Sequence, residues 1–498
     1  MVEDSLKKRY SIKLFANMLS GIIGIILVAI VPKSLGLIQY GQFIYLQDFF
    51  TRVIGFLDMG SSIAFFTKLS AQHTRKELIT FYFFYSLALL LIALLSLFII
   101  KSLGYSDTII PNIPLQYIYL GLFFGFFTWI TQIFIKISDA FALTVSVELI
   151  KIGHKILSLL LLLYFVYLTA FDLTTYFYYH YIALTSFLLI IGWLFIKKGI
   201  LDKNIITLDF RFKQISKEFI QYCSPLVAYN IVGILVGLLD IWLLQTMAGS
   251  EQMGFYGLSY SLAAMSILFT SAMTPIITRE FSKSYAQNDL AQMRKLFCRY
   301  IPMLYSIAAY FALFISFQSE NLLAIFTDEK FKDAFLVLTV MALYPIHQTY
   351  GQLSGSIVHA TGQTKLYRNI GIASSLIGLI VSFVFIYLLD LKALGLGIKL
   401  ILAQIIATNI QLYFNAKFLQ LELRYFIMHQ IYSLLFFMVL SGASTYVITL
   451  TSPLAALLIS GFIYTLFVII FAYIFPQIFV LTRDDIKNNL RKIMIRRE

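Results

Sequence analysis

Three charged side chains at helical spacing open an otherwise apolar run of the chain. Residues 147–167 have the sequence VELIKIGHKILSLLLLLYFVY, with Glu148, Lys151 and Lys155 near its start. In a helix, at about 100° per residue, these three lie within roughly 60° of one another, whereas His154 lies farther around. A cationic stripe with one acidic partner could form the wall of a polar path. The same lysines could instead form a collar that extends toward lipid headgroups.

Further charged residues interrupt other apolar stretches. Asp48 and Arg52 are four residues apart and can pair on one helix. Asp58 follows in FLDMGSS, and Asp240 lies in IVGILVGLLDIWLL with Asn230 on the same predicted helix. An ionised side chain at the bilayer centre costs about 2.5–3.5 kcal/mol, so each must be paired or line a wet cavity. The alternatives are a structural ion pair for Asp48 and Arg52, and solvation near a helix end for Asp240.

Two polar residues in the second half of the chain have less specific signals. His347 follows Pro345 in ALYPIHQTYGQ, where we expect a broken helix that frees backbone carbonyls. His347 is a candidate for the polar lining of a path, as are His154 and Asn230, although hydrogen-bonded packing is the commoner role of such a histidine. Lys399 is predicted to reach the outer interface.

The composition indicates a helical membrane protein with many spans. The chain has 498 residues, of which 60% are hydrophobic and 13% are charged, and its mean hydropathy is +0.84. Apolar stretches of 18 or more residues recur from end to end. We therefore predict an all-α integral membrane protein with about fourteen transmembrane helices. The predicted spans lie near 13–32, 42–66, 79–100, 115–136, 147–169, 175–196, 224–247, 255–278, 299–318, 334–358, 367–389, 393–416, 428–450 and 454–478.

The basic residues give the orientation. If the amino terminus lies in the cytoplasm, most of the 38 Lys and Arg fall in the tails and inner loops. Only five are expected on the outer side of the membrane: Lys33, Lys101, Lys330, Lys332 and Lys392. Both termini are therefore predicted to be cytoplasmic. Inner-loop cations facing anionic lipids also explain the net charge of +13, so a nucleic-acid partner is not expected.

A weak internal repeat suggests the domain organisation. Tyr40-Gly41 and Tyr256-Gly257 both lie near the outer start of a span that ends in a basic inner loop. This predicts two pseudo-symmetric six-helix lobes related by an axis along the membrane normal. The predicted parts are a first lobe at 1–197, an amphipathic cytoplasmic linker at 198–222, a second lobe at 223–420, and two extra helices with a basic tail at 421–498.

Signatures of enzyme chemistry are missing from the sequence. It contains no G-x-x-x-x-G-K-[ST] and no H-E-x-x-H motif. Cys223 and Cys298 fit neither a disulfide framework nor a zinc spacing. The outer loops are short, which argues against a membrane polymerase or ligase. We predict a transporter rather than an enzyme, with no cofactor and no metal.

Several segments resemble bacterial polysaccharide flippases of the multidrug/oligosaccharidyl-lipid/polysaccharide (MOP) exporter superfamily. They are VPKSLGLIQYGQFIYLQDFFTRVIGFLDMGSSIAFFTKLSAQ, SAMTPIITREFSKSYAQNDLAQMRKL and HATGQTKLYRNIGIASSLIGLIVSFVFIY. The similarity extends over nearly the whole chain, but its motifs are loose patterns of Gly, Pro and charge.

This resemblance implies a fold like that of the multidrug and toxic compound extrusion (MATE) transporters, with alternating access. It implies translocation of an undecaprenyl-pyrophosphate-linked oligosaccharide, such as an O-antigen, capsule or exopolysaccharide unit, across the bacterial inner membrane. By residue type and location, Arg52, Lys151 and Lys155 match a cationic lumen for the pyrophosphate. Asp58 and Asp240 would be coupling acids for H⁺ or Na⁺, and Asp48 and Glu148 would be partners of the cations.

Other functions are compatible with the same sequence. A multidrug cation antiporter of this fold would normally have twelve spans and an acid-rich cavity. A peptidoglycan-precursor flippase would also have fourteen helices and a cationic lumen.

For a polysaccharide flippase, the expected partners are the polyprenyl-pyrophosphate glycan, membrane lipids and the polysaccharide polymerase machinery of lipopolysaccharide biosynthesis.

Overall fold

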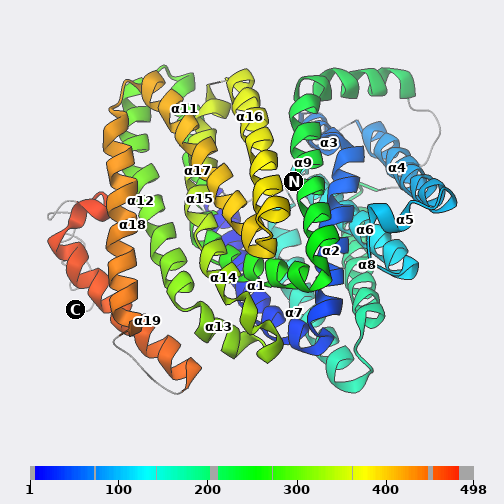
Figure 1. Cartoon of the computed structure of the whole chain (residues 1–498). Coiled ribbons are helices and arrows are strands. Elements are labelled where there is room, and N and C mark those ends of the chain that lie inside the picture. Colours follow the sequence, from blue (N-terminus) through cyan, green and yellow to red (C-terminus); the bar gives the residue numbers. More distant parts are fainter. Residues whose placement is uncertain are drawn as a thin grey trace. The chain divides into compact units, whose positions relative to one another are not determined.

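Helices make up the regular structure of the described chain (Figure 1). The computed structural model describes residues 6–71, 75–141, 143–201, 211–271, 273–361, 363–446 and 452–481, and these ranges contain no strand. Ten helices in them are long and apolar enough to cross a membrane. The other predicted spans correspond to helices that are shorter, interrupted or merged. The all-α membrane fold is thus confirmed.

The chain divides into two compact units, Met1–Gly254 and Phe255–Glu498. The described helices of the first unit are α1 (Leu6–Leu35), α2 (Leu37–Asp58), α3 (Ser61–Ala71), α4 (Glu77–Ser102), α5 (Ser106–Ile109), α6 (Leu115–Ala140), α7 (Thr144–Leu168), α8 (Leu173–Lys197) and most of α9 (Phe212–Ala264). The second unit contains α10 (Ile267–Ser271), α11 (Thr274–Ala286), α12 (Leu290–Phe317), α13 (Ser319–Phe326), η1 (Glu329–Ala334), α14 (Phe335–Met341), α15 (Tyr344–Ala360), α16 (Thr364–Ser382), η2 (Phe383–Leu388), α17 (Lys392–Leu419), α18 (Leu423–Tyr446), α19 (Pro453–Ile474) and η3 (Pro476–Phe479).

The boundary between the two compact units lies after Gly254, and the predicted division into lobes remains a prediction. The predicted second lobe begins at residue 223, whereas in the structure α9 belongs to the first unit as far as Gly254. Within α9 the backbone leaves helical geometry at Gly249, where φ is 75° and ψ is −176°. Glycine adopts this conformation without the steric cost of a side chain. Part of the predicted linker, residues 202–210, lies outside the described residues.

Two predicted spans are interrupted in the structure. The span expected at 42–66 is broken after Asp58, because Met59 and Gly60 adopt left-handed conformations with φ of 47° and 82°. The tenth predicted span is broken between Met341 and Tyr344, just before Pro345, as its proline predicts. Both breaks place polar side chains next to free helix ends.

Each unit has its own apolar core. The core of the first unit includes Phe65, Leu78, Ile133 and Phe195, and the start of α9 packs onto it through Phe219. The core of the second unit is described by residues from α11, α12, α15, α17, α18, α19 and η3, among them Phe281, Phe297, Tyr350, Leu412, Phe437, Tyr464 and Ile478. The two predicted extra helices, α18 and α19, are therefore part of the second unit's packing.

Candidate functional site

The charged stripe near the start of α7 consists of Glu148, Lys151 and Lys155. Its acid is bonded to one of the two lysines. The Lys151 ammonium donates a hydrogen bond of 2.9 Å to Glu148 Oε1. Glu148 is buried, with 5% of its surface exposed, whereas the Lys151 side chain is 24% exposed. Lys155 is half-buried one turn further along, and its ammonium makes no hydrogen bond or ion pair with another described residue. The stripe therefore has spare capacity for an anion.

His154 faces away from this stripe. Its Nε2 is 3.0 Å from Ser186 Oγ of α8, and its Nδ1 is 3.3 Å from Ser158 Oγ on its own helix. Its ring packs against Phe187, with 5.1 Å between the ring centroids. The prediction from helical spacing that His154 lies on a different side of the helix from the charged stripe is confirmed. These contacts are those of a packing residue between α7 and α8, and a role in lining a path remains a prediction.

Arg52 and Asp48 form the ion pair that their spacing predicts. Arg52 Nη2 donates to Asp48 Oδ2 at 3.1 Å, and each side chain is 31% exposed. The guanidinium also lies against Gly237 of α9, where an added Cβ would be 2.0 Å from Arg52 Nη1. A side chain at that position would require the arginine to move. Sequence analysis did not identify Gly237, because nothing in its local sequence reveals a partner on α2.

Asp240 and Asn230 lie on α9 but at different levels of the first unit. Asp240 is buried, with 5% exposed, and follows Gly237 by three residues, so it shares a helix face with the Arg52 contact. Asn230 lies about ten residues, or ~15 Å, away along the helix. Its amide nitrogen is 3.5 Å from the position of a Cβ built on Gly60, at the break between α2 and α3. The two residues thus do not form one site.

Asp58 is the centre of a closed hydrogen-bond cluster at that break. Its Oδ1 accepts from Ser61 Oγ at 2.7 Å, from the Ser62 backbone N–H at 3.1 Å and from the Tyr82 hydroxyl at 2.9 Å. Its Oδ2 accepts from Ser62 Oγ at 2.9 Å. The carboxylate thus accepts from one of the first backbone N–H groups of α3 and interacts favourably with its helix dipole. Asp58 is therefore far from isolated, and its role as a coupling acid remains a prediction.

Lys136 of α6 extends the Asp58 cluster, although sequence analysis did not single it out. Its ammonium donates a hydrogen bond of 2.6 Å to Ser62 Oγ. The cluster so joins α2, α3, α4 and α6. Lys136 lies at the predicted end of a span, where a lysine normally looks like a loop cation. Its partner is 74 residues away, so only the fold could reveal the contact.

His347 lies in a buried aromatic cluster of the second unit. The residue is 6% exposed, and its Nδ1 has no hydrogen-bond partner among the described residues. Its ring meets Tyr305 edge to face, with centroids 5.7 Å apart, and Tyr305 meets Tyr350 in the same way at 5.4 Å. This surrounding is aromatic rather than cationic. His347 therefore belongs to a different environment from the α7 stripe.

The prediction for Lys399 is wrong. Instead of reaching the interface, Lys399 is buried, with 6% exposed, between α16 and α17. Gly378 of α16 makes this possible, since a Cβ there would be 2.9 Å from Lys399 Cε. The second unit thus contains a buried cation that hydropathy alone assigned to the surface.

The described residues contain no group of three or more His, Cys, Asp or Glu that could hold a metal ion. What they offer chemically is anion binding. Lys151 and Lys155 provide ammonium donors on α7, and Arg52 provides a guanidinium on α2. Each paired cation, Lys151 and Arg52, has an acid on its own helix.

Comparisons with known proteins agree with this fold. No protein-family profile matches the chain. It is 21% identical over 212 residues to the probable low-salt glycan biosynthesis flippase Agl15 of Haloferax volcanii, a match that covers 42% of this chain and 44% of the relative. The chain therefore aligns with less than half the length of that curated relative.

Solved structures match over more of the chain. The lipid II flippase MurJ in an inward closed conformation superposes with a TM-score of 0.69 at 15% identity, covering 92% of this chain and 98% of MurJ. An inward-facing MATE family multidrug transporter of the MOP superfamily superposes with a TM-score of 0.61 at 15% identity, covering 84% and 96%. The chain has the fold shared by MurJ and the MATE transporters. The resemblance to MOP transporters that the sequence indicated is confirmed.

Proposed function

We propose that this chain is a flippase that moves a lipid-linked glycan across the cytoplasmic membrane of a bacterium by alternating access. The anchor of the glycan would be undecaprenyl pyrophosphate, and the glycan an O-antigen, capsule or exopolysaccharide unit. The MOP-transporter fold and the similarity to a probable glycan flippase support this proposal. In this role the chain delivers lipid-linked glycan units for polysaccharide biosynthesis and catalyses no covalent step.

The observation that carries the proposal is the incomplete pairing of the α7 stripe. A half-buried lysine inside a membrane-spanning helix is costly unless it gains a partner. Lys155 makes no hydrogen bond or ion pair with another described residue, and Lys151 is paired with Glu148. A pyrophosphate brings several anionic oxygens, which would satisfy both ammonium groups. The pairing with Glu148 holds Lys151 in place until the phosphate arrives.

The physical barrier to flipping explains why such a stripe is needed. A charged pyrophosphate and hydroxyl-rich sugars lose their hydration in hydrocarbon, and each unsatisfied polar group costs several kcal/mol. Cations on the path replace the water around the phosphate by charge-assisted hydrogen bonds. The polyprenyl tail has no such barrier, because it can stay in the lipid throughout.

An ion gradient would drive the cycle, with H⁺ or Na⁺ as the coupling ion. Of the two candidate acids, the geometry favours Asp240 over Asp58. Asp58 already accepts four hydrogen bonds within its cluster, so a change in its protonation would disrupt the packing of α2, α3 and α4. Asp240 is buried on the α9 face that adjoins Arg52, one of the proposed pyrophosphate ligands.

A second candidate is the flipping of a peptidoglycan precursor. The observation in its favour is the superposition on a lipid II flippase over 92% of the chain. At 15% identity this likeness concerns the fold alone. A multidrug cation antiporter is less compatible with the residues, since the α7 stripe carries two cations and would repel a cationic drug.

Transport in liposomes tests the proposal. The purified chain would be reconstituted with a labelled polyprenyl-pyrophosphate oligosaccharide, and arrival of the glycan in the opposite leaflet would be followed with a membrane-impermeant glycan-modifying reagent. We expect the oligosaccharide lipid to arrive faster with the protein than in protein-free liposomes. With the protein present, we expect lipid II to arrive more slowly than the oligosaccharide lipid. Faster movement of lipid II would favour the second candidate. Equal rates with and without protein would contradict both.

Topology provides a separate check on the orientation. We propose that both termini lie in the cytoplasm, with fourteen crossings. Reporters that are active on only one side of the membrane would be fused after Ser452 and after Glu498. We expect the first reporter to be active outside and the second inside. A carboxy terminus outside the cell would overturn the number of crossings.

A further inference from the structure

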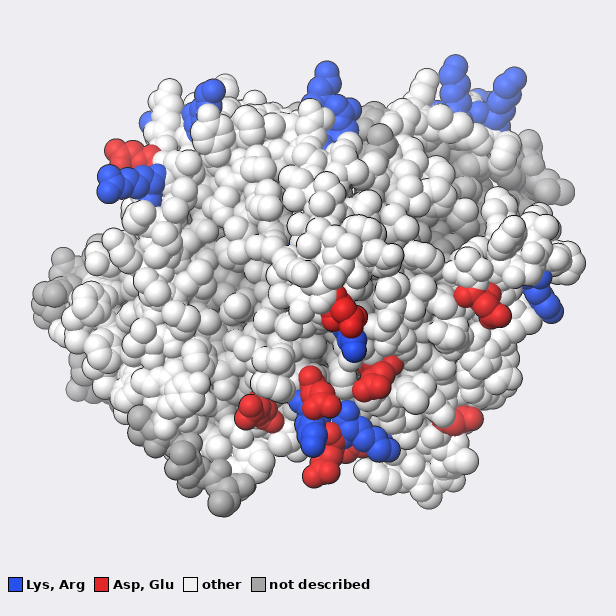
Figure 2. All heavy atoms as spheres, viewed as in Figure 1, with Lys and Arg blue, Asp and Glu red and all other residues white. Residues whose placement is uncertain are grey.

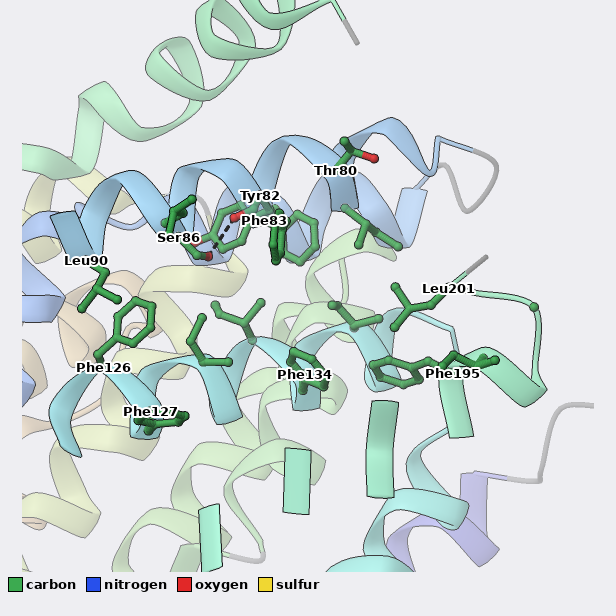
Figure 3. A pocket seen from close by; sticks show the side chains of 18 residues that line it. Thr80, Tyr82, Phe83, Ser86, Leu90, Phe126, Phe127, Phe134, Phe195 and Leu201 are labelled. Atoms are coloured by element: carbon green, nitrogen blue, oxygen red, sulfur yellow. Dashed lines mark hydrogen bonds between the residues drawn. The ribbon is translucent and has the colours of Figure 1, made fainter. Parts of the chain in front are cut away.

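An apolar groove runs between α4 and α6 in the first unit (Figure 3). Its volume is about 960 Å³, and nearly all its lining atoms are apolar. Figure 3 shows side chains of α4, including Phe83 and Leu90, on one wall, and Phe126 and Phe134 of α6 on the other. The ends of α8 and of the segment that follows it close one end of the groove at Phe195 and Leu201.

The groove has a buried floor and an exposed rim. On the floor, Tyr82 is 2% exposed, Ser86 is 6% exposed and Ile133 is 4% exposed. On the rim, Phe83 is 57% exposed and Ile196 is 63% exposed. The groove is therefore open along one side. In a membrane-spanning unit this side meets lipid rather than water.

Its dimensions suit one hydrocarbon chain. Along α4 the lining extends from Ile79 to Leu90, and along α6 from Phe126 to Ile137. At 1.5 Å of rise per residue, either wall is about 15 Å long, which is roughly half the hydrocarbon thickness of a bilayer. A slot of this length, parallel to the helices, fits the part of an extended acyl chain that lies next to the headgroup.

Cations surround the end of the groove that contains Gly199. The Lys76 ammonium donates a hydrogen bond of 2.8 Å to the Gly199 carbonyl, which fixes this lysine at the opening. Lys197 and Lys198 directly precede Gly199 and are exposed, with the Lys197 ammonium 5.2 Å from the centre of the Trp193 ring. Since α4 begins and α8 ends here, this opening lies at the level of lipid headgroups.

Two acids near this opening, Glu77 and Glu218, are already paired. Glu77 accepts from Arg75 at 3.0 Å. Glu218 accepts from Lys68 at 3.0 Å and from Arg75 at 3.2 Å. Among the described residues, the opening thus keeps a surplus of positive charge beside an apolar slot. This combination complements an amphiphile with an anionic head and a hydrocarbon tail.

We propose that the groove is a binding site for an anionic membrane phospholipid, with one acyl chain between α4 and α6 and the phosphate near Lys76, Lys197 and Lys198. The bound lipid is distinct from the transported glycan lipid, whose pyrophosphate we assign to the lysines of α7. The inference therefore stands independently of the proposed function.

The floor of the groove connects this lipid to the Asp58 cluster. Tyr82 lines the groove with its ring and donates its hydroxyl to Asp58 Oδ1 at 2.9 Å. Phe65 also lines the groove and stacks on Tyr82, with 4.3 Å between ring centroids. An acyl chain in the slot packs against both rings and holds α4 beside α6. The lipid thereby stabilises the same part of the unit that Asp58 organises.

Quenching of Trp129 fluorescence by brominated acyl chains tests this site. The Trp129 ring lies 5.9 Å from Tyr82 and 6.0 Å from Phe126, which both line the groove. The other two tryptophans would be removed by Trp193→Phe and Trp242→Phe. The full chain would be placed in nanodiscs with bromine either on an anionic phospholipid or on a neutral one, at equal lipid composition. We expect stronger quenching when the anionic lipid carries the bromine.

Variants separate the headgroup from the chain. Each of Lys76→Gln, Lys197→Gln and Lys198→Gln should lower the preference for anionic lipid about threefold to fivefold. Lys101→Gln, an exposed lysine at the other end of α4, is the matched control and should have no effect. Ser86→Phe should fill the slot and reduce quenching by both lipids. Ser102→Phe is its control, because Ser102 also donates to the carbonyl four residues earlier but lies outside the groove.

Three results would overturn the proposal. Equal quenching by anionic and neutral lipids would show a collar of lysines without a lipid site. Quenching that persists fully in Ser86→Phe would place the bromine elsewhere. Release of quenching by an equimolar polyprenyl pyrophosphate would assign the groove to the transported lipid instead.

Discussion

The Asp58 cluster and the α7 stripe both place charge inside the first unit, but they differ in how completely the charges are satisfied. Asp58 accepts four hydrogen bonds from α3 and α4, and Lys136 closes the cluster from α6. On α7, Glu148 binds Lys151 alone, and Lys155 has no partner among the described residues. A saturated cluster holds helices together, whereas an unsaturated stripe retains the capacity to bind a ligand.

A second comparison concerns how each unit accommodates a cation next to a helix. Arg52 lies against Gly237 in the first unit, and Lys399 lies against Gly378 in the second. In both cases a missing side chain leaves room for the charged group beside the helix backbone. Figure 2 shows that charged side chains are sparse on the face in view, where uncharged residues form most of the surface.

The largest effect is expected on stability, at the Asp58 cluster, where the carboxylate has all its hydrogen bonds. Asp58→Asn removes the carboxylate that accepts from Ser61, Ser62 and Tyr82, so the variant should lose about 2–4 kcal/mol of stability. Thermal unfolding of the detergent-solubilised chain measures this. Asp48→Asn is the control, because the partly exposed Asp48–Arg52 pair should contribute only about 0–1 kcal/mol. Equal stability of Asp58→Asn and the unsubstituted chain would break the comparison.

Substitution on the stripe should affect transport more than stability. Lys151→Ala removes one charge-assisted contact to pyrophosphate, worth roughly 1.5–3 kcal/mol, and should slow flipping about tenfold to a hundredfold. Lys151→Arg should retain most activity, and Lys151→Glu should be the worst of the three. Rates are normalised to protein in the membrane, with Lys101→Ala as control. A Lys151→Ala variant that transports normally but unfolds early would reverse the roles of the two regions.

A smaller effect is expected from the acid next to Arg52. Asp240→Asn should reduce the dependence of flipping on an imposed proton or sodium gradient about fivefold, equivalent to ~1 kcal/mol of coupling. Initial rates with and without the gradient measure this ratio. Asn230→Ala on the same helix serves as the control. Full gradient dependence in Asp240→Asn would make this aspartate a structural residue.

The smallest effect concerns the ion pairs that attach the start of α9. The hydrogen bond from Lys68, together with Arg75 and against partial desolvation, lowers the pKa of Glu218 below its ordinary value of 4.5. A lowered carboxyl pKa stabilises the folded state above pH 4.5, and this contribution is lost as pH falls through the folded-state pKa. Glu218→Gln should therefore cost about 0.5–1 kcal/mol near neutral pH and less in acid. The exposed Glu422→Gln is the control, and a pH-independent difference would contradict this account.

The sequence predicted those features that depend on nearby residues. The ion pair of Asp48 with Arg52, the facing of His154 and the helix break before Pro345 follow from helical spacing and backbone chemistry, and the structure confirms them. The contact of Lys136 with Ser62 joins helices far apart in the chain, so periodicity could not reveal it. Lys399 was misplaced because hydropathy does not show that Gly378 makes room for it.

The most direct test of the central claim compares glycan lipids that differ only in the number of phosphates. Flipping of a pyrophosphate-linked and a monophosphate-linked glycan would be measured for the unsubstituted chain and for Lys151→Ala with Lys155→Ala. We predict that the unsubstituted chain moves the pyrophosphate lipid at least tenfold faster, and that the double variant loses this preference. Full transport and an unchanged preference in the double variant would show that the α7 lysines form only a collar.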